Sequence, residues 1–348
     1  MLAVDFYESG KGETIILTFP DGGLGIVDAH PSASKGRPKI EDLVSGKQVH
    51  FICLTHPHAD HGLDLMAAFK AATHVGSYWH TVTDVQAIMY AVTQQDTFPS
   101  RYNPVLEVLR KDWANFLIDL YVEVGTRDDT FPGFIRRISA DRRSEKVGEV
   151  DVHFFGPLEA DQNKYTAVYR DRLLGKHRKK PDENSLSAVL AFQYGPNVIW
   201  LGSDALSANW IVAVERCRKE HFPKAAILKV PHHRGLDARG GGKKYNYLAL
   251  CKPNSETQSV LFAGDVKHPH EAVFNDLTSR TSLMCLANGR KGGRAAEQNI
   301  LNLAIPGAYT VADAQICNTH IGFKLFGDGK IERTNGAQCD FCVGKSRT

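Results

Sequence analysis

Residues 49–61, VHFICLTHPHADH, are the stretch that decides the fold of this chain. The first part, VHFICL, is apolar enough to form a β-strand that is buried on both faces. Polar residues follow at once, and packing does not explain so many of them at the end of a buried strand. Imidazole and carboxylate groups together suit zinc, manganese or iron. Four candidate metal ligands lie on the loop that leaves this strand: His56, His58, Asp60 and His61.

We expect this loop to hold two metal ions. Alternation along an extended chain points His56 and His58 to one side, whereas Asp60 and His61 turn toward a second point. Two ions about 3.5–4 Å apart support hydrolysis. The alternative is a surface loop that is merely rich in histidine, and it is disfavoured because later segments supply further ligands.

Those further candidates also stand at the ends of apolar runs. Asp204 follows NVIWLG, where its carboxylate can bridge two cations or can cap a helix that starts near Ala205. His232 and His233 follow AAILKV, and a pair of histidines at a strand end is rarely part of a core. Asp28 ends LGIVD, and either orienting a ligand histidine or forming a turn explains it equally well.

The composition is that of an ordinary globular protein. The chain has 348 residues, of which 43% are hydrophobic and 23% charged, so it can bury a sizeable core. The formal net charge of +3 permits the binding of polyanions if the basic residues are clustered.

Neither secretion nor membrane insertion is predicted. The start, MLAVDFYESGKGE, lacks the features of a secretory signal, and no uncharged apolar run reaches the roughly 18 residues of a membrane span. The seven cysteines are scattered and odd in number, which predicts reduced thiols in the cytoplasm. Cys339 and Cys342 form a CxxC pair, but without a second pair we expect an ordinary tail rather than a zinc ribbon or a redox motif.

The pattern of elements predicts an α/β protein with two packed sheets and flanking helices. Expected strands cover residues 2–7, 13–19, 24–28, 49–54, 150–155, 186–194, 197–202, 225–230 and 259–264. Expected helices cover residues 40–46, 63–72, 158–174, 206–220 and 271–279. A hairpin is expected over residues 315–333, with its turn at Gly327-Asp328-Gly329.

One domain is expected over residues 1–348. Residues 81–148 have aromatic and aliphatic side chains at helical spacing, charges between them and little glycine, which predicts a mainly helical insertion. Packing or covering the site explains this insertion more simply than reading a substrate does. Residues 334–348 form a short C-terminal tail.

The series of motifs THPHADHG, ENSLSAVL, GSDA, LKVPHHRG and HPHEAV resembles that of the metallo-β-lactamase superfamily. More narrowly, it is similar to the hydrolase domain of ComEC-type DNA-uptake proteins and to bacterial phosphorylcholine esterases. The similarity runs from about residue 1 to residue 333 and is broken by the insertion. It implies a four-layer αββα sandwich and a metal-dependent hydrolase that uses a metal-activated hydroxide. ComEC-type proteins carry membrane segments that this sequence lacks, so DNA uptake is not implied.

The resemblance also implies a set of metal ligands for two divalent ions, Zn or Mn. His56 and His58 would hold the first ion, and Asp60 and His61 the second. Asp204 would bridge the two ions, and His232 would complete the second site.

Other matched positions are implied to act on the substrate. Asp60 could orient the nucleophile, His233 would protonate the leaving group, and His268 would lie at the rim of the pocket. Asn184, followed by Ser185, stands where many superfamily members have a third histidine for the first metal. The first site is therefore poorer in nitrogen ligands, which implies partial occupancy or a substrate oxygen as ligand.

This sequence departs from the pattern of the subgroup at three places. Ser203 stands where a glycine usually precedes the bridging acid, Arg234 follows the paired histidines, and Lys267 precedes His268. None of these changes removes a ligand. Arg234 and Lys267 add positive charge near the expected metals.

A phosphodiester is the substrate that the sequence favours, with DNA or RNA as candidate partners. Basic runs occupy residues 170–180, 239–244 and 290–294, and the last two are rich in glycine. Each run alone is explained by a solvated surface. A hydrolase of carboxylic esters, lactones or thioesters is the first alternative, although it would favour an apolar pocket and a full set of histidines. A weakly active binding module on the same fold is the second, although it would predict a lost ligand.

Overall fold

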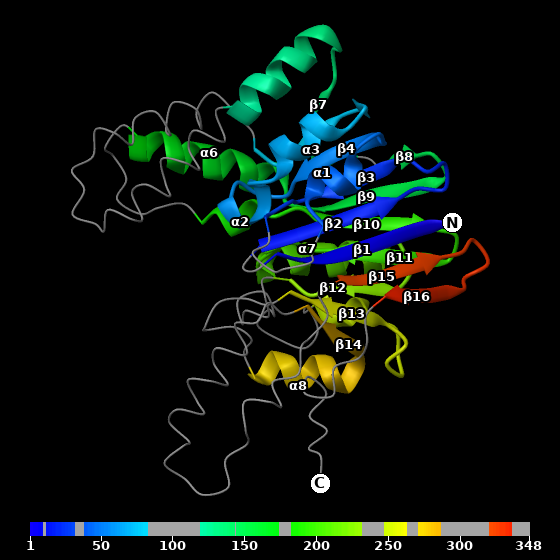
Figure 1. The fold of residues 1–348 in the computed structure, drawn as a ribbon. Coiled ribbons are helices and arrows are strands. Elements are labelled where there is room, and N and C mark those ends of the chain that lie inside the picture. Colours follow the sequence, from blue (N-terminus) through cyan, green and yellow to red (C-terminus); the bar gives the residue numbers. More distant parts are fainter. Residues whose placement is uncertain are drawn as a thin grey trace, which may run out of the picture.

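A computed structural model describes residues 1–9, 12–31, 38–82, 119–142, 144–173, 182–231, 247–262, 271–286 and 320–335. These residues form two β-sheets that pack face to face, with helices on the outer face of each sheet (Figure 1). The predicted α/β fold class, an αββα sandwich, is therefore confirmed.

In the described part of the chain, the first sheet has nine strands, in the order β16-β15-β1-β2-β3-β4-β6-β7, with β5 also pairing with β4. The half that carries β1, β2, β15 and β16 is antiparallel, whereas β3, β4, β6 and β7 run parallel. The strands are β1 (Leu2–Ser9), β2 (Gly12–Thr18), β3 (Leu24–Val27), β4 (Gln48–Leu54), β5 (His74–Val75), β6 (Tyr78–His80), β7 (Ile135–Arg137), β15 (His320–Leu325) and β16 (Ile331–Asn335).

The second sheet has seven described strands, in the order β14-β13-β12-β11-β10-β9-β8. It is parallel from β11 to β14 and antiparallel from β8 to β11. The strands are β8 (Glu145–Val147), β9 (Val150–Gly156), β10 (Val189–Tyr194), β11 (Asn197–Leu201), β12 (Ile227–Lys229), β13 (Gln258–Leu261) and β14 (Ser282–Cys285).

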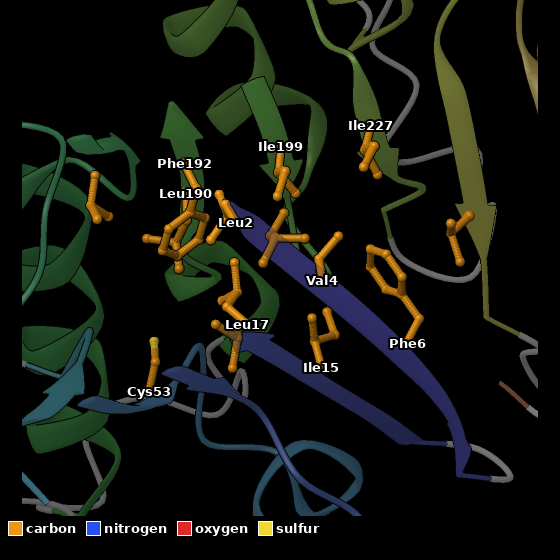
Figure 2. Close-up of a cluster of buried hydrophobic side chains, with 14 of the residues drawn as sticks. Leu2, Val4, Phe6, Ile15, Leu17, Cys53, Leu190, Phe192, Ile199 and Ile227 are labelled. Atoms are coloured by element: carbon orange, nitrogen blue, oxygen red, sulfur yellow. The ribbon is translucent and has the colours of Figure 1, made fainter. Parts of the chain in front are cut away.

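The central core lies between the two sheets. Figure 2 shows side chains of β1 and β2 that point toward side chains of β10, β11 and β12. Every second residue of β1 takes part, namely Leu2, Val4 and Phe6, because alternate side chains of a strand point to the same face. Leu190 and Phe192 repeat this spacing on β10.

Helices cover two further apolar clusters on the outer faces. The first sheet packs against helices α1 and α3, and the second against α7, whose Trp210 is fully buried. The described helices are α1 (Ile40–Val44), α2 (Ala59–Gly62), α3 (Leu65–Ala71), α6 (Glu159–Leu173), α7 (Ser207–Lys219) and α8 (Glu271–Arg280), with 3-10 turns η2 (Glu183–Leu186) and η5 (Tyr247–Leu250). Residues 119–130 are also helical.

The expected helical insertion differs from the structure in its last part. Residues 119–130 are helical, but β7 and β8 follow within the segment 81–148 and extend the edges of the two sheets. Both strands have three residues and carry charged side chains, as edge strands often do, so the sequence gives no alternating apolar signal. Residues 83–118 lie outside the described residues, as does the tail from residue 336.

The hairpin expected near the C-terminus is present as β15 and β16. Its turn is closed by the amide of Phe326, which donates to the carbonyl of Lys330 at 2.9 Å. Gly329 adopts φ +98°, a backbone conformation that residues other than glycine rarely adopt. In the part of the chain that the structure describes, no helix is long and apolar enough to cross a membrane.

Candidate metal centre

The candidate metal centre lies where strand ends from both sheets meet. Because β3 and β4 are parallel neighbours, Asp28 and His56 follow them at the same edge of the first sheet. Because β11 and β12 are also parallel neighbours, Asp204 and Lys229 stand at the matching edge of the second sheet. Two parallel halves thus bring together residues that are far apart in the sequence.

Three of the predicted ligands form one compact group: His56, His61 and Asp204. One ligand atom from each lies within 4.8 Å of the others, and all three residues are buried. The rings of His56 and His61 have centroids 4.2 Å apart, and Nε2 of His61 lies 3.8 Å from Oδ2 of Asp204. Asp204 does not cap a helix, because α7 begins at Ser207 with Leu206 at its N-cap position.

Asp28 sets the orientation of His61. Its Oδ2 lies 2.7 Å from Nδ1 of His61, and the same carboxylate accepts hydrogen bonds from the amide and hydroxyl of Thr55 at 2.9 and 2.7 Å. A carboxylate only accepts, so the imidazole proton is placed on Nδ1 and the lone pair on Nε2. Nε2 is buried and makes no hydrogen bond within the described residues.

His58 lies beside His56. Nδ1 of His58 is 3.0 Å from Nε2 of His56, which is a separation at which two imidazole nitrogens share a proton or a cation. The other nitrogen, Nε2 of His58, lies 3.5 Å from Oε2 of Glu183 on η2. The loop of the first sheet and the turn that precedes β10 therefore meet at His58.

A pair of hydroxyl groups joins the two sheets under the centre. The hydroxyl of Thr55 donates to Asp28, so the hydroxyl of Ser203 donates to Thr55 across 2.5 Å. Nδ1 of His56 lies 3.2 and 3.3 Å from the same two oxygens. Ser203 adopts φ 44°, in the region that favours the glycine of the related motif, and its hydroxyl gains contacts that glycine lacks.

Burial and charge act in opposite directions on the two inner histidines. Burial, together with the positive charges of His61 and His58, holds the pKa of His56 well below its usual range. Burial alone would also lower the pKa of His61, but the carboxylates of Asp28 and Asp204 raise it well above its usual range. Burial therefore favours the neutral form of His56, whereas the carboxylates beside His61 favour a positive charge there, which either a second ring proton or a metal ion on Nε2 would supply.

The donor set fits a divalent transition metal. Two buried imidazoles, one of them with its Nε2 unbonded, face a buried carboxylate, and zinc and manganese accept this combination. Asp60 is half-buried on α2, beside His61 in sequence, and belongs to no group of three ligand atoms within 4.8 Å among the described residues. Its assignment as a ligand stays a prediction.

Several predicted site residues cannot be placed. His232, His233, Arg234, Lys267 and His268 lie outside the described residues. Asn184 is described and is buried on η2, next to Glu183, which contacts His58.

The sequence analysis did not identify a buried ion pair that lies beside the candidate ligands. Glu13 on β2 and Lys229 on β12 are fully buried and form an ion pair beside His61 and Asp204. The sequence could have indicated that Lys229 forms an ion pair, because a lysine inside a strand that is buried on both faces needs a charged partner. No pattern in the sequence identified Glu13 as this partner, because the two residues meet only when the first sheet packs against the second.

Replacing Asp28 with asparagine is expected to weaken metal binding about 10–100-fold, the usual cost of losing a group that orients a metal ligand. Asparagine tolerates the φ of 56° at this position, so the backbone should stay in place. The matched control is Asp5→Asn, because Asp5 contacts His320 at the same 2.7 Å elsewhere in the sheet. Competition with a chromophoric chelator measures the affinity, and equal affinities in the two variants would contradict the orienting role.

Comparison with known proteins gives a family match for one part of the chain. Residues 13–155 match the family model of the Metallo-beta-lactamase superfamily, a segment that contains Glu13, Asp28 and the histidine loop but not Asp204. No curated protein sequence gives a significant match.

Three similar solved structures share 10–12% identity with the chain. CmlA, a diiron beta-hydroxylase from Streptomyces venezuelae, covers 65% of this chain and 34% of its own (TM-score 0.35, 12% identity). A metallo hydrolase from the archaeon Ignicoccus hospitalis covers 93% and 100% (TM-score 0.39, 11% identity). A diphosphatase from the PhnP family covers 83% and 96% (TM-score 0.38, 10% identity).

The chain spans 46%, 34% and 58% of the length of the first three solved structures that it matches. Likenesses this distant carry no assignment of activity. The family match covers residues 13–155, which build most of the first sheet and the start of the second.

Proposed function

We propose that this protein is a metal-dependent hydrolase of the metallo-beta-lactamase superfamily. The observation that carries the proposal is the buried group of His56, His61 and Asp204, whose ligand atoms lie within 4.8 Å of one another at the ends of β4 and β11. Two imidazoles and a carboxylate in a buried cluster cost free energy unless a cation or proton joins them. The family match over residues 13–155 supports the same class of protein.

The proposed ligand set extends beyond this group. His58, Asp60 and His232 complete it: His58 and Asp60 stand at the start of α2, directly after β4, and His232 follows β12 in the sequence. Divalent ions bound there would activate water for attack and would stabilise the negative charge that develops on the substrate. His233 is the proposed proton donor to the leaving group, because two adjacent side chains do not easily point at the same cation.

For the substrate we propose a phosphodiester, either in a nucleic acid or in a nucleotide. The basic runs at 170–180, 239–244 and 290–294, with Arg234 and Lys267 close to candidate ligands in sequence, support a substrate of negative charge. Asn184, on the turn that meets His58, leaves the first metal with fewer nitrogen ligands and with room for a phosphate oxygen.

The test is steady-state kinetics with Mn²⁺ and Zn²⁺ each supplied. The substrates are bis-p-nitrophenyl phosphate, DNA, RNA, cyclic nucleotides, a lactone and a thioester. We expect phosphodiester cleavage, and we expect Arg234→Ala to slow it by roughly 10²-fold, the lower end for losing a group that stabilises transition-state charge. Arg218→Ala, an exposed arginine at the end of α7, is the control and should leave the rate unchanged.

Two outcomes sharpen or reject the substrate assignment. A polymer substrate should bind with an affinity that falls steeply with salt, whereas a nucleotide should show a shallow slope, because each phosphate contact releases counterions. Efficient turnover of the lactone or thioester, with no phosphodiester cleavage under either metal, would refute the phosphodiester and leave the metal site standing.

A further inference from the structure

A fully buried lysine lies at the edge of the candidate metal centre. Lys229 ends β12, has no exposed surface, and places its ammonium 5.8 Å from the ring of Phe262. Glu13, which is also fully buried, contacts this ammonium from β2 of the other sheet. A buried ion pair is weak support for stability, because apolar residues of similar volume often replace it without loss. Another reason for its presence is therefore needed.

The location of Lys229 supplies that reason. Glu13, Asp28 and His61 form a second buried group of ligand atoms within 4.8 Å, and a metal ion could enter it. The ammonium of Lys229 contacts Oε1 of Glu13, so a cation of the protein itself already stands at this group. Oε2 of the same glutamate lies 4.0 Å from Nδ1 of His61.

Lys229 also faces the carboxylate of Asp204. Its ammonium donates to the carbonyl of Ser203 at 2.7 Å and lies 3.9 Å from Oδ1 of Asp204. The other oxygen, Oδ2, lies 3.8 Å from Nε2 of His61. Asp204 is thus held between a fixed cation on one side and the candidate metal ligands on the other.

We propose that Glu13 and Lys229 are a positioning pair for the metal centre. Lys229 turns Oδ1 of Asp204 toward itself and presents Oδ2 to the ion that the histidines bind. Glu13 holds the ammonium in place, and the ammonium excludes a metal ion from the group of Glu13, Asp28 and His61. This inference rests on the proposed metal-binding function, and it adds two residues that act on a ligand rather than on the substrate.

The test is the double variant Glu13→Gln Lys229→Met, which removes both charges and leaves no buried ion unpaired. Apo-protein is titrated with Zn²⁺ and Mn²⁺ against a chromophoric chelator, and Co²⁺-loaded protein is examined by visible absorption. We expect affinity to fall about 10–100-fold, as for other groups that orient a metal ligand, and the Co²⁺ bands to shift. Circular dichroism and thermal unfolding establish that the variant is folded.

The control is Ser259→Ala Thr281→Val, which removes a buried hydrogen bond of 2.6 Å between β13 and the residue before β14 and contacts none of the described candidate ligands. It should lower the thermal midpoint and leave the metal affinity unchanged. If the double variant does not fold, Glu13→Asp replaces it, because this change keeps both charges and withdraws the carboxylate from Lys229. Its affinity should fall by about 10-fold, at the lower end of the same range.

Metal affinity and Co²⁺ bands equal to those of the wild type, in whichever of the two variants folds, would overturn the inference and leave a purely structural ion pair. Failure of the wild-type protein itself to bind Zn²⁺, Mn²⁺ or Co²⁺ would instead overturn the proposed function. The two failures are therefore distinguishable.

Discussion

Replacing Asp204 with alanine is expected to weaken metal binding by more than about 100-fold, which exceeds the usual effect of residues that only orient a ligand. Asp204 is the one carboxylate in the buried group with His56 and His61, and its Oδ2 lies 3.8 Å from Nε2 of His61. Lys229 keeps Glu13 as a partner in this variant, so the fold should survive. Elemental analysis after dialysis measures the metal, and the substrate panel measures turnover, which should be lost with it.

The control for this variant is Asp21→Ala. Asp21 is a carboxylate that pairs with a histidine, His50, at 3.0 Å in an exposed turn. It should keep its metal and its activity. Full metal content in Asp204→Ala would place the ions elsewhere and would contradict the candidate centre as described.

The single change Lys229→Met should lower the free energy of unfolding of the apo-protein by about 3–5 kcal/mol, because it removes the ammonium that pairs with the buried carboxylate of Glu13. Denaturation in guanidinium chloride measures this free energy. The double variant Glu13→Gln Lys229→Met should recover most of the loss, since the carboxylate of Glu13 is then neutralised together with its ammonium.

The difference in the free energy of unfolding between these two variants tests whether charge causes the destabilisation. A destabilisation of equal size in the single and double variants would show that the loss comes from packing of the lysine stem rather than from charge. A neutral single variant would show that water or a proton compensates Glu13. Either result contradicts the ion pair as the source of the effect.

The sequence predicts the strands that build the two sheets because their apolar runs are long enough to stand out. It also places His56, His61 and Asp204 at strand ends, where parallel pairing brings them together. Asp28 had two explanations, and the structure contains both features: a left-handed backbone, φ 56°, and a carboxylate on His61.

Two kinds of feature escaped the sequence. Short edge strands such as β7 and β8 have too few residues for a period to be measured. Contacts between the sheets, such as Glu13 with Lys229 or Thr55 with Ser203, depend on how two distant segments face each other. The closeness of the His56 and His61 rings, 4.2 Å between centroids, also depends on the turn of α2, which the sequence pattern did not show.

The division of the candidate centre between the two sheets has a consequence for biosynthesis. A ribosome delivers Asp28, His56 and His61 long before it delivers Asp204 and Lys229. Until the second half of the chain emerges, the nascent acidic cluster has neither its closing carboxylate nor its internal ammonium. The proposed ion site is therefore complete only after both sheets have docked, at the last stage of maturation.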